Sequence, residues 1–414
     1  MRRLGWILLL WMAASPVWAA KKIGVQELRD LLSSLDRAKK TDVEVAAALT
    51  QVELTEQLSR GTMNSLSSFI PGPSATEQLY VLEVRASGFA PPASEIPAIP
   101  VPDAAVQKAI LEKAADYTAK IYAQLPRLKA TKSTFRFQDS GEFLRDDDPD
   151  KHAKAVNSGT TAVSDQQIVH FMSSVESPIE SENGTEKLPA GKVKGQKGQV
   201  DQITLLGQGP VLSAVVREAQ AAGKLAWLRW EMIDGAQAAV FSFAVDKKNS
   251  RYAVNYCCFP ANGQSPDSMS YGNYGARAGV ASAPGGSIPS GSGTSLVLPA
   301  TMTAPQSTDW KNYKAALPYH GELFVDPATG VVLRLVTEAE FKPADLVQQE
   351  RQRIDYGPVT VGGKTLILPV KARISTEVIP SGYTGFGRRP IRSTLFTVDY
   401  KDYAPFDAAP AEQR

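Results

Sequence analysis

The chain has 414 residues, with 45 basic and 43 acidic side chains and a formal net charge of +2. Because the charges nearly cancel and no basic block stands out, nucleic acid is excluded as the expected partner. Only two cysteines are present, so a disulfide framework is excluded as the source of stability.

The first 19 residues have the layout of a secretory signal peptide. Two arginines precede the apolar run Leu4–Met12, and Ala19 is the small residue before the expected cut. That run is shorter than the about 20 residues that a membrane-spanning helix needs, and no later segment is apolar enough. We therefore expect a periplasmic or otherwise exported protein without a transmembrane segment, whose mature chain begins at Ala20 or Lys21. N-terminal sequencing of the protein from its own host tests this, and an uncleaved chain in the membrane pellet would contradict it.

Residues 20–125 show the periodicity of amphipathic helices. An apolar stripe predicts the first helix: Val25, Leu28, Leu31, Leu32 and Leu35. Thr41 and Glu44 form a capping box for a second helix, which Gly61 is expected to end.

Ser74 and Glu77 repeat the capping signature and predict a third helix. Asp103 is placed to cap a fourth helix that runs to about Ile121. Between these two helices lies a proline-rich connector, Pro91–Pro102. The helices could pack on one another or partly on the rest of the chain.

From about Lys132 the periodicity changes to the two-residue alternation of β-strands. The clearest strand is Lys364–Val378, which has an apolar face and a charged face and is expected to be dry on one side and wet on the other. Asp326–Gly330 and the pair Gly362 and Gly363 predict hairpin turns between neighbouring strands.

The predicted fold class is α+β, with N-terminal amphipathic helices followed by a mostly antiparallel sheet. One helix around Val215 interrupts the strands and is ended by Gly223. We expect a helical region at 20–125, with its connector at 91–102, and a β domain at 126–414. Residues 184–199 and 261–306 are poor in large apolar side chains and are predicted to be flexible insertions.

Residues with metal or acid–base chemistry are sparse. His152, His170 and His320 are the only histidines, and none has metal-ligand spacing to another histidine or to cysteine. The acidic run Asp146–Asp150 lacks the spaced ligands of a calcium loop and is predicted to be a solvated turn. We therefore predict no catalytic residue, no cofactor and no metal site.

Two short pairs are open to more than one interpretation. Cys257 and Cys258 are neighbours in a predicted strand, so their side chains point to opposite faces and a bond between them is disfavoured. One thiol is expected to pack inward as a small hydrophobic group. Arg388 and Arg389 could meet a phosphate or lie at an exposed hairpin tip.

The strands predict an extensive apolar face. Its candidate cleft-lining residues are Leu228, Trp230, Phe241, Phe243, Tyr252 and Tyr256. Alternation places Leu228 and Trp230 on the same face, opposite Arg229 and Glu231. Such a face is either a core covered by helices or a cleft for a lipid or hydrophobic partner. We favour the core, because a dry face is first of all something that a fold must bury.

Three segments carry a resemblance to known proteins. They are Gly321–Leu335, Ile354–Lys364 and Leu368–Val370, and Gly209–Cys258 supports them. This part of the chain resembles exported bacterial proteins whose β part looks like the outer-membrane lipoprotein carriers and the periplasmic sigma-factor regulators that share the carrier fold. The resemblance implies a curved, incomplete barrel with helices across its concave face. It also implies binding without catalysis, although fold alone does not determine activity.

We therefore expect a non-enzymatic periplasmic protein that binds a lipid, a lipoprotein or another hydrophobic partner in a half-barrel cleft. The alternative is a protein–protein interaction module that scaffolds or senses the envelope without a small ligand. A hydrolase is the third interpretation, since a nucleophile and a histidine can meet in space without a sequence motif.

Overall fold

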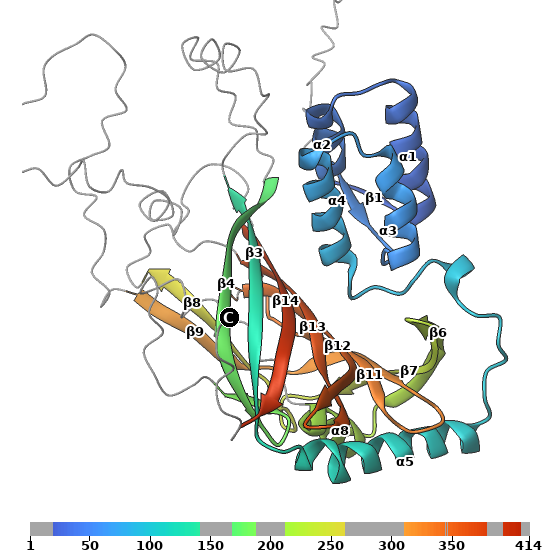
Figure 1. The fold of residues 1–414 in the computed structure, drawn as a ribbon, viewed down its shortest axis with the longest axis vertical. Helices are drawn as coiled ribbons and strands as arrows, with labels where there is room; N and C mark the ends of the chain where they lie inside the picture. The colour runs from blue at the N-terminus through green and yellow to red at the C-terminus, as the bar shows by residue number, and fades with distance from the viewer. Residues whose placement is uncertain are drawn as a thin grey trace, which may run out of the picture.

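The structure is a computed structural model that describes residues 20–140, 168–187, 212–260, 310–343, 345, 347–378 and 392–406 (Figure 1). The predicted signal peptide, the insertion 261–306 and residues 188–199 of the first insertion lie outside these ranges. So do His152, the run Asp146–Asp150 and the pair Arg388 and Arg389. Residues 257 and 258 lie in a described strand, but their side chains are outside the described part.

The described chain is an α+β fold around one large open sheet. Its strands are β3 (Leu128–Ser140), β4 (Ile168–Glu182), β5 (Thr185–Lys187), β6 (Leu225–Ile233), β7 (Ala236–Val245), β10 (Tyr319–Val325), β11 (Val332–Ala339), β12 (Val347–Val361), β13 (Lys364–Val378) and β14 (Arg392–Pro405). Their order is β5-β4-β3-β14-β13-β12-β11-β10-β7-β6, with β5 and β6 as unjoined edges. Every neighbouring pair is antiparallel. The predicted class, α+β with a mostly antiparallel sheet, is confirmed.

Residues 20–90 form a helical unit with its own apolar core. In chain order it contains β1 (Lys21–Ile23), α1 (Val25–Arg37), α2 (Asp42–Thr50), β2 (Val52–Leu54), α3 (Arg60–Leu66), η1 (Ser67–Phe69) and α4 (Pro73–Ala86). Leu28 and Leu32 of the predicted apolar stripe are fully buried there, beside Leu49 of α2. The apolar stripe of α1 therefore packs against the other helices of this unit.

The second predicted helix is shorter than its sequence pattern indicates. Thr41 and Glu44 cap α2 as predicted, but the helix ends at Thr50. The next residues form β2, which pairs in parallel with β1, and Gly61 lies inside α3 instead of ending a helix. The prediction for Gly61 is wrong because the pairing of β1 with β2 is a long-range contact that local periodicity does not show.

The predicted cap of the third helix is also wrong. The helix, α4, begins at Pro73, whose fixed φ suits the first helical position. The carboxylate of Asp42, on α2, accepts hydrogen bonds from the backbone amides of Ser74 and Ala75 at 2.9 and 2.8 Å. Asp42 thus supplies the acceptor that Ser74 was expected to supply, and Glu77 contacts β4 instead.

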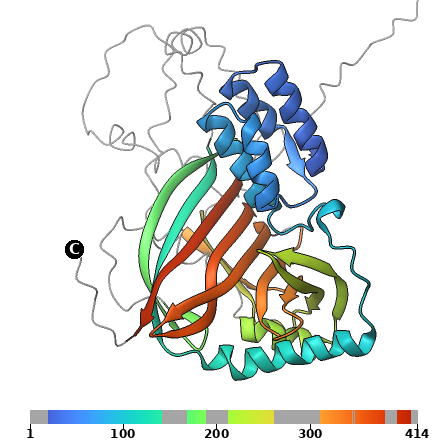
Figure 2. The ribbon, with the colours of Figure 1, turned by 45° about the vertical axis from the view of Figure 1, so that its right-hand side comes forward.

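Two helices outside the helical unit pack on one face of the sheet. After η2 (Ala93–Glu95) the connector leads to α5 (Ala104–Lys120), which Asp103 caps as predicted. The short η3 (Tyr122–Gln124) follows, and α8 (Leu212–Ala222) ends at Gly223, which has a φ of 65°. Apolar side chains of α5 and α8 join those of the sheet in the main core, at the end of the sheet that α5 crosses (Figure 2). We call this face of the sheet the core face.

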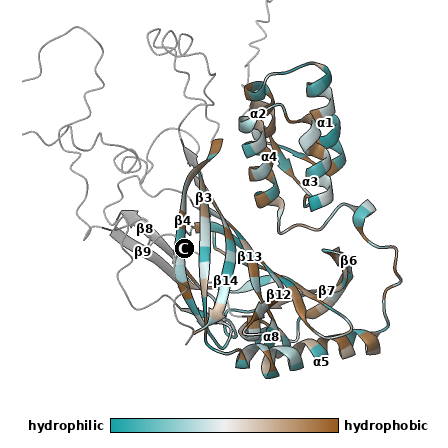
Figure 3. Ribbon diagram, viewed as in Figure 1, coloured by the Kyte–Doolittle hydropathy of each residue, from teal (hydrophilic) through white to brown (hydrophobic). Residues whose placement is uncertain are grey.

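The predicted hairpins are confirmed. Strand β13 has the predicted bounds, and Gly362 and Gly363 join it to β12 with φ values of 56° and 77°. Both values lie in the left-handed region that a tight hairpin turn requires. The strands β8 (Ala253–Pro260) and β9 (Trp310–Ala316) form a separate two-stranded sheet. Polar and apolar residues alternate along the long strands, as Figure 3 shows.

The charged face of β13 is covered around Arg373, which contradicts the predicted wet side at that point, whereas Lys371 on the same face is 43% exposed. We call this second face of the sheet the outer face. Arg373 lies on it, yet its side chain is only 13% exposed because it pairs with Glu83 of α4 at 2.7 Å. Val81 and Val84 of α4 also pack with Leu395 of β14. The helical unit shields this part of the face, and strand alternation by itself does not reveal such a cover.

Candidate functional site

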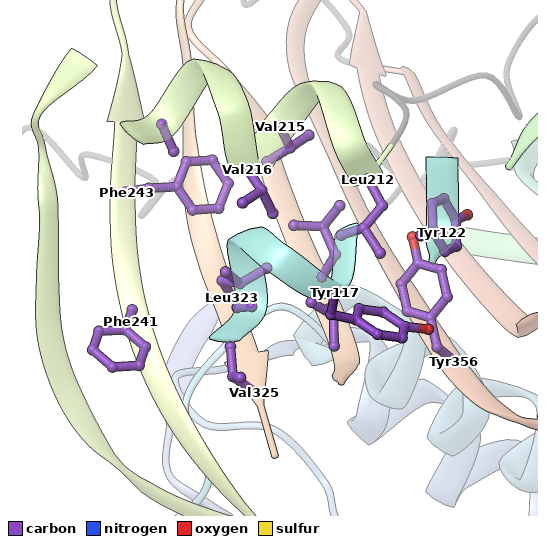
Figure 4. Packing of buried hydrophobic residues seen from close by; sticks show 14 of the residues in the cluster. Tyr117, Tyr122, Leu212, Val215, Val216, Phe241, Phe243, Leu323, Val325 and Tyr356 are labelled. Carbon is purple, nitrogen blue, oxygen red and sulfur yellow. The ribbon is translucent and has the colours of Figure 1, made fainter. Parts of the chain in front are cut away.

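Four of the six predicted cleft residues are packed inside the main core. Trp230, Phe241, Phe243 and Tyr252 are at most 8% exposed and lie in one cluster with side chains of α5 and α8. Figure 4 shows the two phenylalanines on β7 facing the space that these helices fill. Tyr256 lies in β8, but its side chain is outside the described part. That these residues line a cleft stays a prediction.

Leu228 does not share a face with Trp230. In β6, Trp227 and Arg229 pair with consecutive residues of β7, so Leu228 is the extra residue of a β-bulge. The bulge places the ring of Trp227 4.8 Å from that of Trp230 and leaves Leu228 43% exposed on the edge strand. The predicted face is wrong here because strict alternation cannot anticipate a bulge.

The register extends the core face from the main core onto β12, β13, β14 and β3. Directly opposite residues of antiparallel strands share a face, so the pairing defines three rows across these strands. The rows are Glu350–Thr376–Thr394–Gln138, Gln352–Ile374–Phe396–Arg136 and Ile354–Ala372–Val398–Thr134. We call these residues the mixed surface, since it contains both apolar and polar side chains.

The centre of the mixed surface is apolar. Ile374 and Phe396 are 1% and 2% exposed and form a cluster with Val175 of β4. Among the described residues this cluster contains sheet side chains only, whereas the main core also contains those of α5 and α8. The mixed surface is therefore a second apolar region on the core face.

Several polar atoms of the mixed surface have no hydrogen-bond partner among the described residues. They are Thr134 Oγ1, Thr376 Oγ1, Arg136 Nε and Gln352 Nε2. Leaving a buried polar group unpaired costs about 1–3 kcal/mol, and folded proteins leave few of them. Both threonines and the glutamine are at most 3% exposed. Their concentration on one face makes this surface the candidate binding site.

Glu350 lies where the mixed surface meets the main core. One oxygen accepts a hydrogen bond from the Tyr252 hydroxyl at 2.8 Å, and Oε2 has no partner among the described residues. Burial raises the pKa of Glu350 to about 7, although the Tyr252 hydrogen bond acts in the opposite direction. A carboxyl group that titrates near neutral pH is a feature of functional sites, and buried structural pairs can show it too.

A second tyrosine–glutamate pair lies next to the first. The Tyr319 hydroxyl donates to Glu218 of α8 at 2.9 Å, and the rings of Tyr319 and Tyr252 are 5.3 Å apart. Neither glutamate was predicted from the sequence, because neither belongs to a motif. The sequence held one signal: Glu350 is four residues from Ile354, an even spacing that places both side chains on the same face of a strand.

The outer face holds a buried ionic cluster between the sheet and the helical unit. Its members are Glu83, Arg229, Glu231, Glu322, Arg334, Arg353, Asp355 and Arg373. Gln57 of the helical unit joins it by donating to Glu231 at 2.9 Å and accepting from Arg353 at 3.3 Å. Arg229 and Glu231 thus lie opposite Trp230 as predicted, but they are buried rather than wet. Because four arginines meet four carboxylates, the cluster is balanced and serves to hold the helical unit on the sheet.

Asp355 is the centre of this ionic cluster. It accepts from Arg334 Nε at 2.6 Å and from Arg353 Nε at 3.1 Å. Burial alone would raise the pKa of Asp355, but Arg353 and Arg334 outweigh it and hold the pKa at about 2. The carboxylate is therefore charged at neutral pH and accepts charge-assisted hydrogen bonds from two buried guanidinium groups.

The described histidines each contact a glutamate. His170 Nδ1 lies 3.3 Å from Glu77 of α4, and His320 Nδ1 lies 3.2 Å from Glu340. Within the described ranges, no three His, Cys, Asp or Glu side chains gather closely enough to hold a metal ion. The absence of metal and cofactor chemistry stays a prediction.

Comparisons with known proteins found no matching family model, no matching curated protein and no matching solved structure. None of the helices in the described part of the chain combines the length and the apolar character needed to cross a membrane. The likeness to lipoprotein carriers stays a prediction.

Proposed function

We propose that the protein is an exported, non-enzymatic binding protein whose half-barrel sheet holds a lipid, a lipoprotein or another hydrophobic partner on the mixed surface. The observation that carries the proposal is the union, on one face, of an apolar cluster and unpartnered polar atoms. The proposed binding site lies beside the cleft residues predicted from the sequence, at the other end of the same core face.

The chemistry of the mixed surface suits an amphipathic ligand. Ile374 and Phe396 occupy the two central strands, so an alkyl chain would contact apolar side chains there. Arg136 and Gln352 end the same row on β3 and β12, so polar parts of the ligand would meet donors at the margins. Such a division into apolar lining and a few placed polar groups is typical of ligand sites.

We expect binding to strengthen with the length of the alkyl chain. Each methylene removed from water contributes about 0.8 kcal/mol, so each one should lower Kd by roughly fourfold until the surface is covered. Calorimetric titration of the purified mature protein with a fatty-acid series measures this. A folded sample that gives no heat at any chain length would contradict the proposal.

Two neighbouring substitutions on β4 provide a matched pair for this titration. Val175 lies on the core face and packs against the apolar cluster, whereas Ser174 is exposed on the outer face. Val175→Phe should weaken binding by filling part of the surface, and Ser174→Phe should leave Kd unchanged. Equal effects of the two variants would show that the ligand does not lie on this face.

An interaction module is the second candidate function, and the β6 edge favours it. Leu228 and Met232 are 43% and 48% exposed on this edge strand, and Val101 of the connector is 68% exposed. The connector is tied to β6 by a hydrogen bond from Trp230 Nε1 to the Pro100 carbonyl at 3.0 Å. An open edge with apolar side chains suits addition of a partner's strand. A flat fatty-acid titration would leave this candidate in place.

A further inference from the structure

Two donors that have no partner in the described part of the chain lie side by side on β3. Thr134 and Arg136 are two residues apart on a strand, so they share the core face at a Cα spacing of about 7 Å. Thr134 is 2% exposed. Its Oγ1 and the Nε of Arg136 are both buried and have no hydrogen-bond partner among the described residues. An N–H and an O–H so placed together would meet one hydrogen-bond acceptor.

The charge balance of β3 shows which kind of acceptor fits. Lys132, the preceding residue on this face, is 3% exposed and is neutralised by Glu186 at 2.8 Å. Arg136 donates to the amide oxygen of Gln138 and has no carboxylate partner among the described residues. Within the described ranges the charge of Arg136 therefore has no negative counterpart at this end of the mixed surface, and a partly buried positive charge favours an anion.

The apolar cluster begins directly beside these donors. Phe396 is opposite Arg136 in the register, and Val175 is opposite Thr134. An anion bound by the two β3 side chains would therefore have an apolar neighbour on each adjoining strand. The juxtaposition matches a molecule with a charged head joined to an alkyl tail.

We infer that the ligand is an amphipathic anion, an alkyl chain ending in a carboxylate or a phosphate, whose head group is bound by Arg136 and Thr134. This inference rests on the proposed function and adds the chemical class of the ligand. The alkyl tail lies over Ile374 and Phe396. A head group without negative charge would bind the two β3 donors less strongly, because it cannot form a charge-assisted hydrogen bond with Arg136.

Three probes with the same tail test the inference: dodecanoate, dodecyl phosphate and dodecanol, each titrated calorimetrically into the mature protein. A charge-assisted hydrogen bond is lost with the alcohol, so at least one anion should bind about ten- to a hundredfold more tightly than dodecanol. The comparison between the two anions identifies which head group the site takes.

Variants of Arg136 separate head-group binding from tail binding. Arg136→Gln should reduce the affinity for the anions to that for dodecanol and leave dodecanol unchanged, while Arg136→Lys should restore part of the difference. Lys371→Gln is the control, because Lys371 pairs with Asp399 on the outer face and is 43% exposed. Circular dichroism and a thermal melt establish that each variant is folded.

The possible results separate two claims: that the ligand has an anionic head group, and that the mixed surface binds a lipid at all. Equal affinity of the folded wild type for all three probes, or an equal loss for all three in Arg136→Gln, would overturn the anion assignment and keep the lipid-binding function. No binding of any probe would overturn the proposed function itself. Selective loss of anion binding in Arg136→Gln, with partial recovery in Arg136→Lys, supports both.

Discussion

Replacing Asp355 with asparagine is expected to destabilise the protein by about 3–5 kcal/mol at neutral pH, the usual cost of leaving a buried charge without its partner. The carboxylate accepts hydrogen bonds from Arg334 and Arg353, and the asparagine amide cannot neutralise either guanidinium group. Urea unfolding of the ligand-free protein measures the loss as a change in the free energy of unfolding.

Asp399→Asn is the matched control for this substitution. Asp399 lies on the same face of the sheet, but it is 47% exposed and its partner Lys371 is 3.5 Å away. Exposed pairs of this kind contribute about 0–1 kcal/mol, so the control should change little. A similar loss for the two variants would show that the ionic cluster contributes no more than a surface ion pair.

The Asp355 contribution should also depend on pH in a defined direction. Its pKa is lowered from 3.8 to about 2 in the folded chain. A lowered pKa gives stability that is present above 3.8 and lost as the pH falls through about 2. The difference in stability between wild type and Asp355→Asn should therefore narrow over this acid range.

Replacing Glu350 with glutamine is expected to stabilise the ligand-free protein at alkaline pH by up to about 3 kcal/mol. The folded chain holds a proton on Glu350 up to about pH 7, whereas the ordinary value is 4.5. Because its pKa is raised in the folded chain, the contribution of Glu350 to the free energy of unfolding is fully present below pH 4.5 and is lost as the pH rises through about 7. Thermal and urea unfolding at several pH values should show wild type losing stability over this range and the variant losing less.

Tyr252→Phe tests the cause of this pH dependence. The Tyr252 hydroxyl hydrogen-bonds to Glu350 and lowers its pKa, so removing the hydroxyl should move the transition to higher pH. If the transition stays in place in Tyr252→Phe and persists in Glu350→Gln, another group is responsible for it.

Local patterns in the sequence predicted most individual elements. Thr41 and Asp103 cap helices where the capping signals place them, and the two glycines at 362 and 363 join β12 to β13. The prediction was reliable here because a cap or a tight turn depends on residues within a few positions of each other.

Elements that depend on distant partners were predicted less well. The cap of α4 comes from Asp42 on another helix, and the faces of β6 change at the bulge around Leu228. Glu350 and Arg136 were not selected at all, because their importance comes from lying on one surface with Ile374 and Phe396. Those residues are far apart in the chain and meet only through strand pairing.

The sequence by itself determined the α+β class, the helical start, the antiparallel strands and the apolar character of their inner face, since each follows from periodicity and turn chemistry. Only the tertiary structure decided which apolar residues fill the core, which charged residues are buried, and where polar atoms are left without partners. Burial and hydrogen bonding are properties of groups brought together from separate elements. Arg373 is thus shielded by Glu83, and Thr134 Oγ1 is buried without a partner among the residues that the structure describes. For that reason the candidate site became visible in the packing of the sheet and in no single segment of the chain.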